Sequence, residues 1–305
     1  MEAVLYKTFS ALSLGMAFSL YAVGIAIAFR WIKFPDLTGD GSFALGGVVT
    51  ARLIAEGWNV WAAMPVSIVM GILAGACTAS MHRYLRVPKI LAGVLTLMGL
   101  YSINLRILGQ PNLPISREHG VFSIWPEASG AWWALGILAV TAVIVVLVIG
   151  LTWLALESRE GLLTRVAGAN PRLASSVGVS PRRIVWGLAG ANGLIALAGT
   201  LIAQRSYSAD IQMGTGQIIV AVAALFIGMT FFRRPTALHL ALAGIFGSCL
   251  YMVLIQIALE FGLQPQDFRL VSTLIVLGCI VVVAARGGRD ALRRGADAFG
   301  VDLAP

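Results

Sequence analysis

Charged side chains are scarce in this chain of 305 residues. Asp, Glu, Lys and Arg together make up 12% of it, whereas 58% of the residues are hydrophobic. The charged share is about half that of a typical soluble domain, so polar side chains are too few to coat a surface exposed to water. A typical soluble enzyme, a disordered chain and a secreted disulfide scaffold are therefore excluded, and a helical membrane protein is predicted.

Residue types that build common catalytic and metal sites are also rare. The only lysines are Lys7, Lys33 and Lys89, and none lies in a GxxxxGK[ST] phosphate loop, so the chain cannot bind ATP in that way. The three histidines form no HExxH motif, and the three cysteines form no CxxC motif. The sequence therefore predicts no enzyme activity, no metal and no cofactor in this chain.

Long apolar runs occupy most of the sequence, and a helix needs roughly 20 mostly apolar residues to cross a bilayer. Runs of this kind lie near residues 9–29, 60–81, 89–108, 131–154, 184–204, 216–232, 237–259 and 269–285. The sequence therefore predicts an all-α bundle of membrane helices in a single domain, residues 1–305.

A shorter apolar segment, 41–56, leaves the number of spans open because it contains Arg52 and Glu56. If this segment crosses the membrane, the bundle has nine spans and the N-terminus lies outside. If residues 34–56 enter from outside and return, the bundle has eight spans and the N-terminus is cytoplasmic. We therefore expect 8–9 spans, with a broken or re-entrant helix near 34–56.

Basic residues set the expected orientation. The net charge is +8, and most basic residues gather in alternate gaps between the runs. Because cytoplasmic loops carry an excess of Lys and Arg, these gaps are expected in the cytoplasm, and no contact with nucleic acid is expected. The cytoplasmic gaps are 83–89, 157–183, 233–234 and a basic tail, 286–305. The loops expected outside are 109–130, 205–215 and 260–268.

Two polar segments, 34–43 and 210–217, interrupt the apolar pattern. Each places an Asp and two glycines ahead of an apolar helix, as the interrupted helices of transporters do. Proline and glycine free backbone groups near the membrane, and these groups need hydrogen-bond partners. We therefore expect the two breaks to hold functional polar residues.

Polar side chains of the first break have two alternative roles. Asp36, Thr38, Asp40 and Ser42 could bind the free backbone groups or a polar solute. Alternatively, Asp40 or Ser42 caps the helix that follows. Asp36 is harder to explain as a cap, and acids inside a membrane are functional candidates.

Asn104 and Arg106 close one of the predicted spans at its outer end. In one interpretation, Arg106 lies there only to reach the membrane interface, as long basic side chains do. In the other interpretation, both residues line the outer mouth of a solute pathway.

The cytoplasmic segment 157–183 is too long for a simple turn. Its pattern predicts one short helix that ends near Gly168 and a second with Pro171 in its first turn and Gly178 after its end. Such a pair of helices could dock into a soluble partner. The alternative is an amphipathic hairpin at the membrane surface without a partner.

Residues 164–174, followed by Gly178 and Val179, resemble the cytoplasmic coupling segment of permease subunits in ATP-binding-cassette (ABC) importers of the branched-chain amino acid and ribose group. The Ala/Gly-rich stretch 187–199 resembles the helix after that segment. Three shorter segments resemble a narrower subset, the tryptophan/tyrosine-type permeases: 35–43, 102–106 and 214–216.

The resemblance implies the permease subunit of an ABC importer in the bacterial cytoplasmic (inner) membrane. Such a subunit moves a small solute, an amino acid or similar, by alternating access. ATP and Mg²⁺ bind to separate cytoplasmic ATPase subunits, and a periplasmic or lipid-anchored solute-binding protein delivers the solute. A second copy of the permease is expected to complete a homodimer.

Two sets of site residues follow from the motifs and the resemblance together. The expected solute pathway comprises Asp36, Thr38, Asp40, Ser42, Phe43, Asn104, Arg106, Gly214 and Gly216. The expected ATPase-coupling set comprises Thr164, Arg165, Gly168, Asn170, Pro171, Ala174 and Gly178. The sequence departs from the subset at Met229, where an acid is common after the glycine, and at Asp40, where Glu is more frequent.

Two alternatives stay open on the sequence alone. In an ion-coupled secondary transporter, Asp36, Asp40 and Asp210 would hold the coupling ion. An intramembrane enzyme would pair Asp36 with His82 or His239, although no spacing supports that pair.

Overall fold

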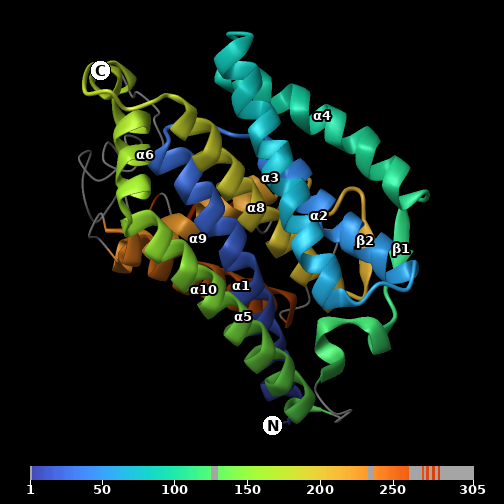
Figure 1. The fold of residues 1–305 in the computed structure, drawn as a ribbon. Helices are drawn as coiled ribbons and strands as arrows, with labels where there is room; N and C mark the ends of the chain where they lie inside the picture. Colours follow the sequence, from blue (N-terminus) through green and yellow to red (C-terminus); the bar gives the residue numbers. More distant parts are fainter. Residues whose placement is uncertain are drawn as a thin grey trace.

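The computed structural model describes residues 2–124, 130–232 and 236–260, together with a few positions between 270 and 281. Within these residues the chain forms ten α-helices, as expected for an all-helical bundle (Figure 1). The predicted run 269–285 lies mostly outside the described residues, and the basic tail 286–305 and the pair at 233–234 lie wholly outside them.

Two buried helices form the centre of the bundle. Helix α1 (Glu2–Ala26) continues into a π-helical turn, η1 (Ile27–Trp31), and α8 (Arg182–Arg205) packs along it. Around this pair lie α2 (Thr38–Ala55), α3 (Val60–Tyr84), α5 (Ala131–Glu157) and α10 (Ala237–Glu260). Helices α4 (Lys89–Leu108) and α9 (Gln217–Phe231) pack outside them, against α2 and α10 respectively.

Six helices are long and apolar enough to cross a membrane by length and composition. They are α1 with η1, α3, α4, α5, α8 and α10. Helix α9, where the sequence predicts a span at 216–232, has only 15 residues. The described residues therefore form a multi-pass helical bundle in which two helices, α2 and α9, differ from ordinary spans.

Helix α2 is one uninterrupted helix of 18 residues. It runs parallel to α8, because Ser42 contacts Asn192 and, two turns later, Thr50 contacts Thr200. A segment that enters the membrane and returns would reverse direction, and α2 does not. Between α2 and α8, glycines allow close packing: a Cβ on Gly199 would overlap the carbonyl oxygen of Phe43.

A small antiparallel sheet departs from the all-α expectation. Strand β1 (Asn112–Pro114) pairs with β2 (Ser208–Asp210) in the register Leu113 to Ala209. Strands of three residues have no periodicity that a sequence pattern can show, and their partners are far apart in the chain. The sheet ties two of the predicted outer loops together.

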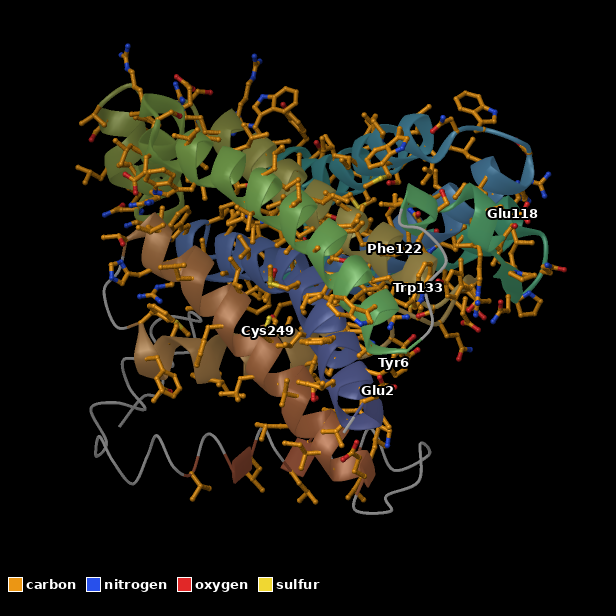
Figure 2. The ribbon with its side chains drawn as sticks, turned by 90° about the horizontal axis from the view of Figure 1, so that it is seen from below. Glu2, Tyr6, Glu118, Phe122, Trp133 and Cys249 are labelled. Carbon is orange, nitrogen blue, oxygen red and sulfur yellow. The ribbon has the colours of Figure 1, made fainter. Side chains whose placement is uncertain are left out.

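One end of the bundle carries the start of α1, the start of α5 and described residues of the predicted outer loop 109–130. Glu2 and Tyr6 of α1 lie at the same end as Trp133 of α5 and the loop with Glu118 and Phe122 (Figures 1 and 2). The opposite end carries the two short helices predicted in the segment 157–183, α6 (Arg159–Ala169) and α7 (Pro171–Ser176).

Candidate functional site

The first break lies between η1 and α2, and Asp36 organises it. The buried carboxylate accepts hydrogen bonds from the backbone N–H of Thr38 (2.9 Å) and from the side-chain amide of Asn192 (2.7 Å). Asp36 thus satisfies a free N–H group in the first turn of α2. The capping role belongs to Asp36 and not to Asp40 or Ser42, because both of these already lie inside α2.

Asn192 joins the break to the middle of α8. It donates to Asp36, and its amide oxygen accepts a hydrogen bond from Ser42 Oγ at 2.7 Å. The sequence pattern did not single out Asn192. The available signal was a lone amide inside an apolar span, which requires buried partners.

Asp40 connects three helices through its carboxylate. Tyr21 of α1 donates its hydroxyl to Oδ1 (2.7 Å), and the backbone N–H groups of Ile218 and Gly216 donate to Oδ1 and Oδ2 (2.9 and 2.8 Å). Gly216 and Ile218 begin α9, so Asp40 caps a helix from another part of the chain. A carboxylate is favourable there because the first N–H groups and the dipole of a helix attract negative charge.

The two sequence breaks are therefore in direct contact. Gly214, in the second break, packs so closely on the first that a Cβ would overlap the carbonyl oxygen of Asp40. Gly216 has φ +81°, a conformation that suits glycine. The close contact explains Gly214, and the backbone conformation explains Gly216.

Hydroxyl groups extend the polar contacts into α3 and α4. Thr38 and Thr78 share a hydrogen bond of 2.7 Å, and Thr78 donates to Thr96 at 2.9 Å. All three side chains are buried. Like Asn192, Thr78 and Thr96 were missed by the sequence analysis, because isolated threonines in apolar spans have no distinctive spacing.

The structure gathers most of the predicted pathway residues around the start of α2 but leaves one apart. Phe43 is buried against the rings of Phe18 and Tyr21. Asn104 is buried and donates to the carbonyl oxygen of Gly41 at 3.4 Å. Arg106 is exposed, as expected of a side chain that reaches the interface.

The predicted coupling residues form a compact hairpin at the opposite end. Ser158 and Asn170 cap α6 and α7 by accepting hydrogen bonds from Gly161 and Leu173. Gly178 follows α7 with φ +77°. The helix boundaries therefore match the predicted ones closely.

Helix α6 is joined tightly to the end of α1. A Cβ on Gly168 would overlap the backbone of Trp31 and lie 2.6 Å from Cα of Ile32. The guanidinium of Arg165 stacks on the Trp31 ring, 3.9 Å from its centre. Thr164 donates to the carbonyl oxygen of Glu160 (2.8 Å) and faces Gly187 of α8.

The position where the sequence departs from the subset, Met229, faces a cation. Arg30 Nη1 lies 2.8 Å from Met229 Sδ, a weak acceptor for a charged donor. An acidic side chain at position 229 would therefore lie beside the guanidinium of Arg30.

The model of the family described as "Branched-chain amino acid transport system / permease component" matches residues 7–284. The chain belongs to this permease family. It is a transport subunit of the membrane and not an enzyme. Within the described residues, no group of three or more His, Cys, Asp or Glu could hold a metal ion.

Relatives with several named solutes match most of the chain. A tyrosine transport system permease protein of Clostridioides difficile is 30% identical over 269 residues, which is 88% of both chains. An uncharacterized protein of Rickettsia prowazekii is 32% identical and covers 83% of this chain and 89% of its own. The xylose transport system permease protein XylH of Escherichia coli is 25% identical over 87% of this chain and 80% of its own. No solved structure matches.

Proposed function

We propose that this chain is the permease subunit of a bacterial ABC importer for an amino acid or a similar small solute. The observation that carries the proposal is the tight joint between the cytoplasmic hairpin α6–α7 and the α1–α2 break. A force on the hairpin can reach the interior of the bundle through this joint.

The expected membrane topology supports the importer arrangement. In the proposed topology the six candidate spans and the helices α2 and α9 all cross the membrane, which makes eight crossings among the described residues. Lys7 pairs with Glu260 at 3.2 Å, so the start of α1 lies beside the end of α10. This agrees with an even number of crossings between them and supports an N-terminus on the outer side. The hairpin then faces the cytoplasm, where an ATPase is located.

Helix α7 offers the surface for that ATPase. Ala174 packs inward against Ala167 and Val179, whereas Leu173 and Val177 are 54% and 63% exposed. These two residues are four apart and lie on one face of the helix. Exposed apolar residues on a loop beyond the membrane mark an interaction site.

A mechanical path leads from the hairpin to the interior. Movement of α6 displaces Trp31 and Ile32, which Gly168 contacts directly. The next residues carry Asp36 and Asp40, and Asp40 holds the first turn of α9. Closure of the ATPases would thus move α2 and α9 together, which is the alternating-access step of this subunit.

A second copy of the chain is needed for the solute path. Around the start of α2, the predicted pathway residues Asp36, Thr38 and Ser42 are buried and bonded to one another or to neighbouring helices. One copy therefore has no open channel at this point, and we place the path between two copies. A solute-binding protein on the outer face would choose the solute.

The ion-coupled alternative receives no support from these contacts. Both oxygens of Asp36 and of Asp40 accept hydrogen bonds from protein N–H or O–H groups. Asp210 Oδ1 accepts from the backbone N–H of Gln212 at 2.6 Å.

The test is co-purification of the ATPase from native membranes in mild detergent. We expect a phosphate-loop ATPase with the wild type and its loss in Leu173→Asp/Val177→Asp, because two charges enter an apolar contact. Val4→Asp, at an exposed site (59%) on the outer end, is the matched control and should retain the ATPase. ATPase bound equally to all three proteins would reject the docking surface. Solute uptake into ATP-free liposomes by the chain alone would reject the importer.

A further inference from the structure

Three basic side chains come together where the residues after η1 reach the turn between α3 and α4. Lys89 Nζ donates a hydrogen bond to the carbonyl oxygen of Lys33 at 2.8 Å, and Arg86 lies in the same turn, three residues before Lys89. Lys33 and Arg86 are exposed, and Lys89 is half-buried. We call Lys33, Arg86 and Lys89 the basic cluster. Arg83, in the last turn of α3, adds a fourth positive charge.

No acid balances the charge of the basic cluster among the described residues. The sequence has no Asp or Glu between Glu56 and Glu118, a stretch that includes α3 and α4. Asp36, three residues after Lys33, is buried, and both of its oxygens already accept hydrogen bonds. The ion pairs within the described ranges all lie elsewhere. The basic cluster is therefore free to attract an anion.

The turn holds these charges close to the membrane surface. Only four residues, 85–88, connect the two candidate spans α3 and α4, so the turn cannot extend far from them. Tyr84, Leu85 and Ile90 are each more than half exposed and place apolar surface beside the charges. Basic residues directly at the ends of spans are within reach of anionic lipid head groups. A soluble partner would need a segment that projects further, as the α6–α7 hairpin does.

We propose that the basic cluster binds the head group of an anionic phospholipid, phosphatidylglycerol or cardiolipin. The lipid phosphate accepts hydrogen bonds from Lys33, Arg86 and Lys89, since an ammonium has three N–H groups and Lys89 uses one of them for Lys33. The acyl chains lie along Ile90 and Leu91, which are exposed on α4. This binding depends on the cluster alone and not on the side of the membrane that it faces.

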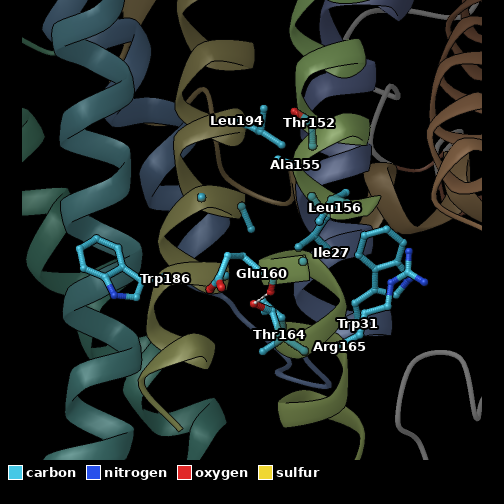
Figure 3. A pocket seen from close by; sticks show the side chains of 15 residues that line it. Ile27, Trp31, Thr152, Ala155, Leu156, Glu160, Thr164, Arg165, Trp186 and Leu194 are labelled. Carbon is cyan, nitrogen blue, oxygen red and sulfur yellow. Dashed lines mark hydrogen bonds between the residues drawn. The ribbon is translucent and has the colours of Figure 1, made fainter. Parts of the chain in front are cut away.

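The lipid would bind beside the joint between α6 and the end of α1. Figure 3 shows this joint, where Trp31 and Arg165 line a cavity of about 300 Å³. Lys33 follows Trp31 by two residues, and Ile32 between them lies against Gly168. A bound lipid would tether this joint to the membrane surface. Such an effect on coupling rests on the proposed function, but the binding of the lipid does not.

The experiment titrates the purified full-length chain, washed in a neutral detergent, with phosphatidylglycerol or with phosphatidylcholine of the same acyl chains. Native mass spectrometry measures the bound lipid. Lys33→Gln/Arg86→Gln should bind phosphatidylglycerol about thirtyfold more weakly, because two basic residues near the head group are lost. Its binding of phosphatidylcholine should not change. Arg172→Gln/Arg182→Gln removes two exposed charges at the same end of the bundle and is the matched control, which should bind both lipids as the wild type does.

A second pair of measurements separates charge from structure. Lys33→Arg/Arg86→Lys keeps both charges and should bind phosphatidylglycerol as tightly as the wild type. Added salt screens exposed charges. It should therefore weaken phosphatidylglycerol binding more in the wild type than in Lys33→Gln/Arg86→Gln.

Four results would overturn the proposal. The first two are equal affinity of the wild type for both lipids and equal loss of binding in the two neutralised variants. The third is competition by inorganic phosphate as effective as that by phosphatidylglycerol, which would make the cluster a phosphate site. The fourth is loss of the ATPase from Lys33→Gln/Arg86→Gln with unchanged lipid binding, which would assign the cluster to the ATPase surface.

Failure of the proposed function would be distinguishable from failure of the lipid site. Solute uptake into ATP-free liposomes would reject the importer and leave the lipid titration unaffected. Absence of selective phosphatidylglycerol binding would reject only the lipid site, because ATPase docking is tested at Leu173 and Val177.

Discussion

The start of α2 and the α6–α7 hairpin both interrupt membrane helices with polar residues, but they satisfy those residues differently. At the start of α2 the partners of Asp36 and Asp40 come from α1, α8 and α9. In the hairpin the caps Ser158 and Asn170 bond groups three residues away. Inside the membrane no water can replace a lost partner, whereas at the cytoplasmic surface it can. We therefore expect the polar contacts at the start of α2 to be sensitive to single changes, and the two helix caps of the hairpin to tolerate them.

The largest effect is expected where α2 and α8 touch. Gly199→Leu would overlap the backbone of Phe43 and force the helices apart. We expect loss of monodisperse protein in size-exclusion chromatography of detergent extracts. Gly190→Leu on the same helix, with open space for its side chain, should keep the wild-type yield. Equal yields for both variants would show that α2 and α8 are not packed as described.

The next effect compares one carboxylate from each region. Asp40→Ala leaves two backbone N–H groups and the Tyr21 hydroxyl without an acceptor, a cost of about 3 kcal/mol or more. Glu160→Ala removes an ion pair between Glu160 and Arg183. Because the Glu160 side chain is 73% exposed, losing this pair costs about 0–1 kcal/mol of stability. Thermal unfolding in one detergent should show a clearly lower Tm only for Asp40→Ala. A similar Tm for both variants would mean that water reaches the start of α2.

The smallest effect concerns the partner of Arg30. Met229→Glu places a carboxylate beside its guanidinium, and a double-mutant cycle with Arg30→Gln should give a favourable coupling of about 1 kcal/mol. The cycle uses the same unfolding measurement. Zero coupling would show that Arg30 and residue 229 do not meet.

The sequence predicts the hairpin more completely than the start of α2, and the reason is the distance to the partners. Pro171 and Gly178 act on their immediate neighbours, so their types and spacing are enough. The breaks at 34–43 and 210–217 are visible for the same reason. The contact between the two breaks at Asp40 depends on how the helices pack. No local sequence pattern predicts that packing.

Isolated polar residues were the other gap in prediction. Asn192, Thr78 and Thr96 each stand alone in an apolar run, and only the fold shows which groups they bond. The coupling role of Arg165 stays a prediction, and its stacking on Trp31 could be seen only in the structure.

The small sheet between β1 and β2 has a consequence for the outer face. It fixes the loop after α4 to the loop before α9, and β2 leads within a few residues to the glycines that pack on Asp40. A protein that presses on the loop after α4 would therefore tilt the start of α9 as well. Under the proposed topology, the outer surface and the α6–α7 hairpin would then act on the same carboxylate from opposite sides of the membrane.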